Sequence, residues 1–252
     1  MKKNKLHIFG CSHSTPCGID DNDAWYFKLA NKLKLEQYKR IGQTGMGSFN
    51  IFFDMLHRIY MNDIDKNDYV ILNTSYSSRW STVNLPQIDN NKNRLGELLN
   101  NIVEPNGNSF STNEGEFDFK SDSNTTIVFL QWIINTTTMY HILKKYCDNV
   151  SIWFLDDPVL LNTICETLLE LGDEYWGNLG IDNMGTTPPK FDINEFGNDV
   201  IIPPNDNKNN PYPDWHSWIN DNSLVNDGHM NKFAHHYFSE YINNFITQKN
   251  TK

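Results

Sequence analysis

Two short stretches at opposite ends of the chain carry side chains that could act together in nucleophilic catalysis. Near the start, a short apolar run ends at Gly10, and Cys11 and Ser12 follow it. Near the end, Asp227 and His229 lie two residues apart, just before a helical pattern. A Ser/His/Asp set needs a nucleophile, a base within hydrogen-bond reach, and an acid that fixes the tautomer of the base. Both ends of the chain together contain these residue types, and one loop would deliver the acid and the base.

Each stretch also has a plainer interpretation. The turn after Gly10 could be a polar loop whose hydroxyl groups bond only to nearby backbone. The turn at Asp227 could be no more than a helix start, with Asp227 bonding to local backbone. Cys11 is an alternative nucleophile to Ser12, and His13 could contact a substrate.

These residues must be positioned by an alternation of apolar strands and amphipathic helices. The predicted strands cover residues 6–9, 36–41, 69–72, 150–155 and 200–202, and the predicted helices cover 24–34, 51–59, 126–146, 159–171 and 232–246. This alternation is typical of an α/β fold with a doubly wound, mostly parallel sheet. The turns that follow the strands would then meet at one edge of the sheet, where open α/β folds build their sites.

Two details of the predicted helices are specific enough to test. Asp23 is expected to cap the helix over residues 24–34. In the last helix, four aromatic residues recur every fourth position and are expected to form its buried face. They are Phe233, Tyr237, Tyr241 and Phe245.

The length of 252 residues suits one large α/β domain. We expect residues 1–252 to form that domain, with a loop-rich insertion around 81–124 and a loop region rich in proline and aromatic residues around 173–218. The net charge of −10 argues against nucleic acid or an anionic membrane surface as the main partner. The sequence contains neither a signal-peptide core nor a membrane-spanning run, so a cytoplasmic location is expected. The four cysteines fit no zinc pattern, and no metal or organic cofactor is expected.

Three blocks of the sequence resemble the SGNH/GDSL hydrolases, and the opening Ile8-Phe9-Gly10-Cys11-Ser12-His13 is most similar to the divergent members found in phage genomes, so the chain could be virus-encoded. The blocks are Gly10-Cys11-Ser12 after the first strand, Gly47-Ser48-Phe49-Asn50 at the second helix, and Asp227-Gly228-His229-Met230-Asn231 before the last helix. The resemblance implies a three-layer α/β/α sandwich with a flavodoxin-like sheet. It also implies an esterase or O-deacetylase that acts on an acyl ester, such as an O-acetylated glycan or another small ester.

Carried onto this sequence, the resemblance makes Ser12 the nucleophile, His229 its base and Asp227 the acid that orients His229. The backbone N–H groups of Ser12 and Gly47 would help to form the oxyanion hole. The family's remaining donor is an asparagine within a Gly-x-Asn-Asp motif after the third strand, and this chain lacks that motif. The residues that could replace that donor are Asn73, Ser75 and Ser77, with Asn73 favoured by its chemistry.

Two further departures bear on activity. Cys11 stands where the family has Asp, and Asp227 and His229 follow an Asp-x-His spacing where Asp-x-x-His is usual. The alternative hypothesis is therefore a weakly active or inactive protein of the same fold, either a glycan-binding module or a structural protein of a phage particle. The sequence does not determine the acyl group, the alcohol or the oligomeric state.

Overall fold

The computed structural model describes the parts of the chain that form the central sheet and the helices around it. They are residues 4–14, 18–37, 47–74, 80–81, 112–113, 123–156, 161, 191–202, 215, 225–226 and 229–249. Most of the predicted helix over 159–171 and most of the two predicted loop regions fall outside these ranges.

The central sheet is parallel, as the alternating pattern predicts. Its strands follow the order β2-β1-β3-β6, and every neighbouring pair runs in the same direction. The bounds of these strands are Lys5–Phe9 for β1, Glu36–Gln37 for β2, Tyr69–Asn73 for β3 and Asn149–Trp153 for β6. In place of the predicted strand over 200–202, Val200 makes a single parallel bridge to Ile152 of β6.

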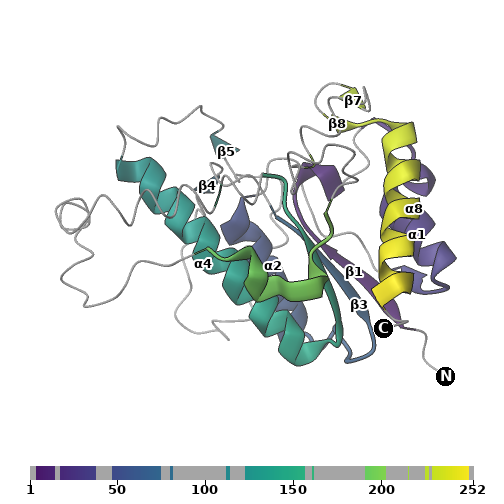
Figure 1. Ribbon diagram of the computed structural model, residues 1–252, viewed down its shortest axis with the longest axis horizontal. Coiled ribbons are helices and arrows are strands. Elements are labelled where there is room, and N and C mark those ends of the chain that lie inside the picture. Colours follow the sequence, from purple (N-terminus) through teal and green to yellow (C-terminus); the bar gives the residue numbers. More distant parts are fainter. Residues whose placement is uncertain are drawn as a thin grey trace, which may run out of the picture.

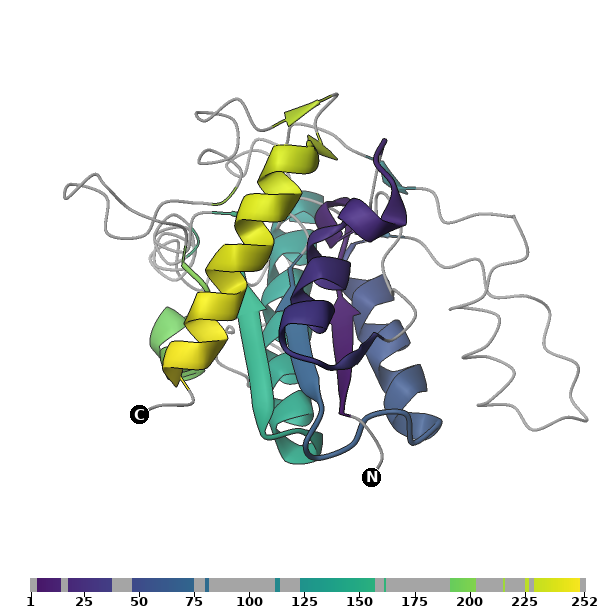
Figure 2. The ribbon, with the colours of Figure 1, turned by 90° about the vertical axis from the view of Figure 1, so that its right-hand side faces the viewer.

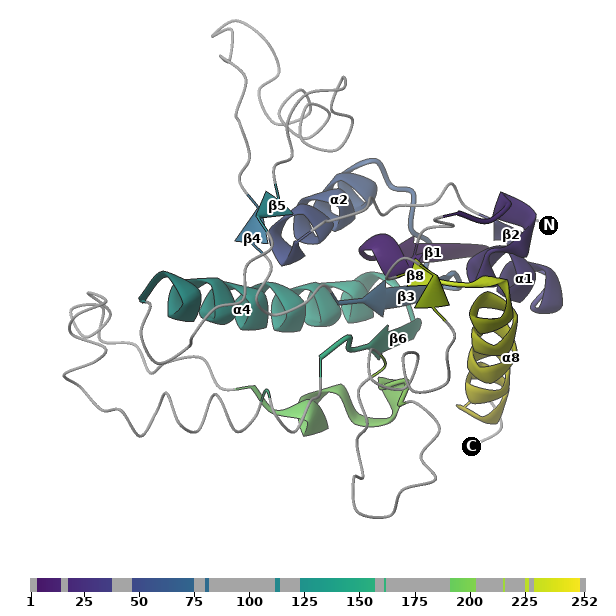
Figure 3. The ribbon, with the colours of Figure 1, turned by 90° about the horizontal axis from the view of Figure 1, so that it is seen from above.

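Helices cover both faces of this sheet, so the chain forms the expected three layers (Figure 2). Helices α1 (Trp25–Lys32) and α8 (Lys232–Lys249) pack against each other on one face. Helices α2 (Ser48–Tyr60) and α4 (Ser123–Tyr146) pack against each other on the other face. Seen from above, the strands lie between these two helix pairs (Figure 3). The predicted α/β class is therefore confirmed, and the strand order is that of a flavodoxin-like sheet.

Strand alternation divides the core between the two faces. Leu6 and Ile8 of β1 join the cluster under α1 and α8, while Phe9 joins the cluster under α2 and α4. In β3, Ile71 belongs to the first cluster and Leu72 to the second. Because side chains alternate along a strand, the next residue, Asn73, falls on the α1/α8 face.

The start of α1 differs from the sequence-based expectation. Asp23 does not cap this helix, because it pairs with Lys28 at 3.1 Å and with Lys232 at 2.7 Å. The first N–H of the helix, that of Trp25, donates to Nδ1 of His235 at 3.1 Å. A side chain from α8, about two hundred residues away in the sequence, therefore performs the capping.

The buried face of α8 differs in part from the prediction, since Tyr241 and Phe245 pack partly buried against the core as expected. Phe233 is 77% exposed and Tyr237 is 41% exposed, so neither belongs to the buried stripe. The buried residues lie mostly one position later, and they are Ala234, His235, Phe238, Ser239, Ile242 and Ile246. The two stripes adjoin on the helix, and packing against α1 and the sheet selects the second one.

Short elements complete the described chain (Figure 1). Strands β4 (Trp80–Ser81) and β5 (Thr112–Asn113) form one antiparallel pair, and β7 (Val225–Asn226) and β8 (His229–Met230) form another. The 3₁₀ helices are η1 (Ser12–Ser14), η2 (Asp21–Asp23) and η4 (Ile193–Asp199). Among the described helices, none is both long and apolar enough to cross a membrane.

Candidate active site

The site lies where the sheet changes its winding direction. From β1 the chain crosses to β2 on one side of β1, and β3 then pairs with β1 on the other side. In open α/β sheets this arrangement leaves a crevice outside the carboxyl ends of the two central strands. The residues that follow those strands here are Gly10 to Ser14 after β1 and Asn73 and Thr74 at the end of β3.

Gly10 allows these two strand ends to approach closely. A Cβ atom at position 10 would lie 2.3 Å from Oγ of Ser14 and 2.8 Å from Oδ1 of Asn73, which is far inside contact distance. Gly10 is not among the described glycines with a positive φ. It is therefore required by space rather than by an unusual backbone conformation.

The side chain of Asn73 is held by the turn that contains Ser12. Its Oδ1 accepts hydrogen bonds from the backbone N–H of Cys11 at 3.4 Å, from Sγ of Cys11 at 3.4 Å and from Oγ of Ser14 at 3.1 Å. A backbone N–H can only donate, so the oxygen of the amide must face the turn. The nitrogen Nδ2 then points elsewhere, and it is buried with no hydrogen-bond partner in the described part of the chain.

Thr74 anchors the end of β3 to the neighbouring strand. Its N–H donates to the carbonyl of Trp153 at 3.1 Å, and its Oγ1 accepts from the N–H of Leu155 at 3.2 Å. These two bonds fix the position of the adjacent Asn73 from the β6 side. Ser75 and Ser77, the other predicted candidates for the donor, lie outside the described residues.

His229 reaches the same edge of the sheet from the end of the chain. It opens β8, and η1 packs against this strand. The ring centroids of His13 and His229 are 6.3 Å apart, and the rings are tilted by 40°. The hairpin of β7 and β8 lies at the end of α8 nearest to the carboxyl edge of the sheet (Figure 1). The fold thus brings the turn of Ser12, the amide of Asn73 and the ring of His229 to one edge.

The structure describes the predicted catalytic residues to different extents. The backbone of Ser12 opens η1, whose shape is fixed by the hydrogen bond from the N–H of Ser14 to the carbonyl of Cys11 at 2.9 Å. Asp227 and Gly228 lie outside the described residues. The cap of α8 is Asn231, whose Oδ1 accepts from the N–H of Ala234 at 3.0 Å. The side-chain cap at the start of α8 is therefore provided by Asn231.

Gly47 is buried and forms the N-terminal cap of α2. Oγ of the following Ser48 accepts from Nδ2 of Asn135 at 3.3 Å, which ties α2 to α4. The role of the backbone N–H of Gly47 as an oxyanion donor stays a prediction.

Two other histidines have structural contacts. His235 is buried and accepts the N–H of Trp25, and burial lowers its pKa to about 4. His7 is buried on β1, and its Nε2 lies 3.0 Å from Oδ2 of Asp68. Burial lowers the pKa of His7, although the Asp68 carboxylate opposes the shift. Both histidines are therefore neutral members of the core near neutral pH.

Cys11 is an unfavourable alternative nucleophile. Its side chain is fully buried, and its thiol donates to Oδ1 of Asn73 and, at 3.9 Å, to the carbonyl of Thr74. This thiol helps to hold the end of β3, a role that its position in the sequence did not reveal. Within the described ranges, no three His, Cys, Asp or Glu side chains gather as metal ligands would.

One contributor to the site was missed by the sequence reasoning, namely Ser14. It is fully buried and makes the shortest of the hydrogen bonds to Asn73. The only local signal for it was its place two residues after Ser12 in the same turn.

Comparisons with known proteins give distant structural similarities. No family model matches the sequence, and no curated protein matches it. Among solved structures, the esterase EstA from Pseudoalteromonas sp. is 11% identical, with a TM-score of 0.48 over 99% of this chain and 100% of that one. The acetyl xylan esterase Est2A from Butyrivibrio proteoclasticus is 13% identical, with a TM-score of 0.46 over 100% of this chain and 65% of that one.

A third solved structure is described as a lipolytic protein of the G-D-S-L family from Desulfitobacterium hafniense. It is 11% identical, with a TM-score of 0.43 over 96% of this chain and 99% of that one. Similarities this distant assign neither a family nor an activity to the chain.

Proposed function

We propose that the chain is a serine ester hydrolase of the SGNH/GDSL type, with its site at the carboxyl edge between β1 and β3. The observation that carries the proposal is the buried Nδ2 of Asn73, which has no partner in the described part of the chain. A buried amide N–H without an acceptor is costly, and such groups call for an explanation. An oxygen of the substrate that becomes negative during the reaction would be the missing acceptor.

In the proposed reaction, Oγ of Ser12 attacks the carbonyl carbon of the ester. His229 accepts the hydroxyl proton and returns it to the leaving alcohol, which gives an acyl-serine. A water molecule, deprotonated by His229, then attacks the acyl-serine, and the proton returns to Ser12 as the acid leaves. Asp227 would hold the imidazole in the required tautomer.

Charge on the carbonyl oxygen develops only in the transition state, so donors aimed at it lower the barrier selectively. We assign this role to Nδ2 of Asn73 and to the backbone N–H groups of Ser12 and Gly47, with Ser75 and Ser77 as the other candidates for the side-chain donor. The position of Asn73 as the last residue of β3 supports it as the replacement for the missing Gly-x-Asn-Asp asparagine.

The finer parts of the proposal come from the sequence resemblance. An O-acetylated glycan or another small ester is the proposed substrate class, and a phage-type subgroup stays a prediction. The rival hypothesis, a binding or structural protein of the same fold, requires that Ser12 is not reactive.

Labelling of Ser12 by a fluorophosphonate probe tests the proposal directly. We expect the wild-type protein to be labelled and to hydrolyse p-nitrophenyl acetate, and we expect Ser12→Ala to lose both properties with little change in Tm. His236→Ala is a matched control, because His236 is exposed on α8 and should retain both properties. An unlabelled, inactive wild-type protein would favour the binding or structural alternative.

A further inference from the structure

We propose that Ser14 is a positioning residue, which holds the amide of Asn73 so that its nitrogen faces the developing oxyanion. The inference rests on the proposed function, since it assigns a task to a further residue of the same site. Ser14 would act through Asn73 and would not itself contact the substrate.

The position of Ser14 is well determined by its surroundings. It ends η1, its side chain is fully buried, and its N–H donates to the carbonyl of Cys11 at 2.9 Å. Its hydroxyl donates to Oδ1 of Asn73 at 3.1 Å, across 59 residues of sequence. A buried hydroxyl in this position has little freedom to choose another partner.

An asparagine amide can occupy two orientations that differ by a half turn and have nearly the same shape. In the observed orientation, the oxygen faces three donor groups and the nitrogen faces away from them. In the flipped orientation, the nitrogen would meet the N–H of Cys11, and the amide oxygen would face the oxyanion. Two donors in contact and two oxygens in contact both disfavour the flipped form, which could not stabilise the transition state.

The backbone N–H of Cys11 selects this orientation because it can only donate, and Ser14 then makes the shortest contact that holds the amide in place. The Ser14 bond of 3.1 Å is shorter than the two contacts of Cys11 at 3.4 Å, and a thiol is a weak donor. Gly10 is a second, independent sign that the pair is built into the strand ends. Any side chain at position 10 would overlap both Oγ of Ser14 and Oδ1 of Asn73.

A double-mutant cycle on the full chain separates this role from general stabilisation. Ser14→Ala should lower kcat for p-nitrophenyl acetate about tenfold with KM little changed, because only transition-state stabilisation is lost. In the Asn73→Ala background, Ser14→Ala should have no further effect, since Ser14 acts through that amide. The matched control is Ser239→Ala, another buried serine, whose hydroxyl donates to the carbonyl of His236 in α8. This control should leave kcat unchanged.

A second measurement does not depend on activity. The side-chain amide signals of Asn73, assigned in ¹⁵N-labelled protein by their loss in Asn73→Ala, should shift in Ser14→Ala and stay in place in Ser239→Ala. Unchanged Asn73 signals, or an additive cycle in an active protein, would overturn the role of Ser14 while the proposed function stands. A wild-type protein that is neither labelled by fluorophosphonate nor active would overturn both.

Discussion

At the scale of single residues, the site depends on one amide whose two ends have different surroundings. The oxygen of Asn73 is bonded to Cys11 and Ser14, whereas its nitrogen is buried with no partner among the described residues. A buried N–H group without an acceptor lowers the free energy of unfolding of the substrate-free protein. The loss is offset only when an acceptor binds, as a transition state with a negative oxygen would.

Replacing Asn73 by Ala should therefore reduce kcat by about 10²–10³-fold, the usual effect of losing one side-chain donor from an oxyanion hole. The change should affect KM much less, because the donor acts on charge that the substrate does not yet carry. Steady-state kinetics with p-nitrophenyl acetate would measure this.

Asn135→Ala is the matched control, since Asn135 is also a buried asparagine but bonds to Ser48 in the layer of α2 and α4. A loss in kcat below about threefold for Asn73→Ala would argue that the hole has no side-chain donor at this position.

At the scale of elements, aromatic packing and one histidine hold together the helices on one face of the sheet. The layer of α1 and α8 carries aromatic rings that pack edge to face around Trp153, where Trp25 and Trp215 lie with centroids 6.5 Å and 5.9 Å away. Trp215 is buried and its Nε1 donates to the carbonyl of Ile201 at 3.1 Å. This tryptophan therefore belongs to the core.

His235 links the two helices of this layer, because its Nδ1 accepts the first N–H of α1. Its Ala variant should lower the free energy of unfolding by about 1–3 kcal/mol at pH 7, since a buried donor loses its partner. The His235→Ala protein that remains folded should retain the proposed esterase activity. Thermal unfolding and p-nitrophenyl acetate assays would test both points.

His229→Ala is the contrasting variant, and we expect it to lose the proposed activity while its Tm stays nearly unchanged.

The pKa of about 4 for His235 makes the free energy of unfolding depend on pH. The unfolded histidine takes up a proton near pH 6.5 while the folded one resists it, so the contribution of His235 to stability should disappear as the pH falls from 6.5 to 4. If His235→Ala instead abolished activity at full stability, the assignment of His229 as the base would be wrong.

At the scale of the whole molecule, one buried carboxylate, that of Asp199, joins elements from both faces of the sheet. Asp199 at the end of η4 accepts from Lys249 of α8 at 2.5 Å, from Lys144 of α4 at 2.9 Å and from the hydroxyl of Tyr140 at 2.7 Å. Burial would raise the pKa of Asp199, but these three donors outweigh it and hold the pKa below its ordinary value. Lys249 also donates to the carbonyl of Val150 at 2.8 Å.

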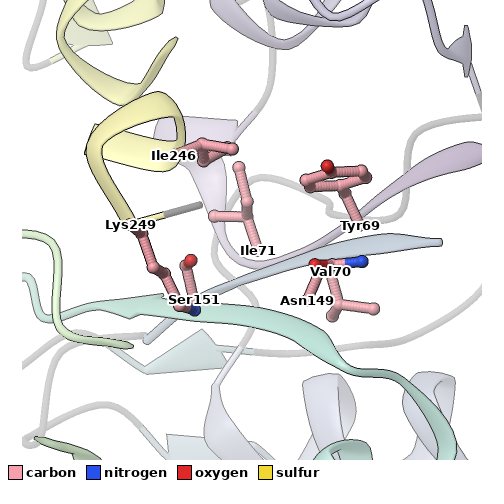
Figure 4. Close-up of a pocket in the computed structure, with 7 residues that line it drawn as sticks. All are labelled: Tyr69, Val70, Ile71, Asn149, Ser151, Ile246 and Lys249. Carbon is pink, nitrogen blue, oxygen red and sulfur yellow. The ribbon is translucent and has the colours of Figure 1, made fainter. Parts of the chain in front are cut away.

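Beside this network is a small surface hollow between the ends of β3, β6 and α8 (Figure 4). Ile71 and Ile246 line its apolar side, and Ser151 and Lys249 lie at its polar side. The hollow lies under α8 near the starting ends of the strands, away from Gly10 and Asn73, so it is separate from the candidate site.

The pKa of the Asp54 carboxyl in α2 is shifted upward, opposite in direction to the shift of Asp199. Asp54 is buried, neither of its oxygens has a hydrogen-bond partner among the described residues, and Nε of Arg58 is 4.0 Å away. Burial raises the pKa of Asp54 to about 7 and outweighs the opposing effect of Arg58. Between pH 4 and 7 the unfolded chain releases this proton while the folded chain keeps it. The contribution of Asp54 to stability is therefore lost as the pH rises through this range.

The Asp54→Asn variant should thus gain stability relative to the wild type as the pH rises from 4 to 8, by at most about 4 kcal/mol. Urea unfolding at several pH values would measure the difference. Asp148→Asn is the control, because Asp148 is exposed and its pairing with Lys66 at 3.8 Å is a surface contact. A difference between Asp54→Asn and the wild type that does not change with pH would contradict the raised pKa.

Much of this molecule can be predicted from local patterns in its sequence. Apolar runs and amphipathic spacing were sufficient to locate β1, β3, β6, α2, α4 and α8 to within a few residues, because periodicity is a local property of a strand or helix. Alternation of strands and helices then implied a parallel sheet with its turns at one edge. The residue types of Ser12, Asp227 and His229 suggested nucleophilic catalysis, and the resemblance to the SGNH/GDSL hydrolases assigned their roles.

The tertiary structure alone decided which partners these local features meet. Residues far apart in the chain meet in three places. These are the hydrogen bond between Ser14 and Asn73, the capping of α1 by His235 and the packing of the buried face of α8. Side-chain hydrogen bonds of this kind depend on the relative placement of strands and helices, which no periodicity encodes. The sequence left three candidates for the oxyanion donor, and the contacts that hold Asn73 exist only because β1 and β3 pair in parallel, with Phe9 opposite Leu72.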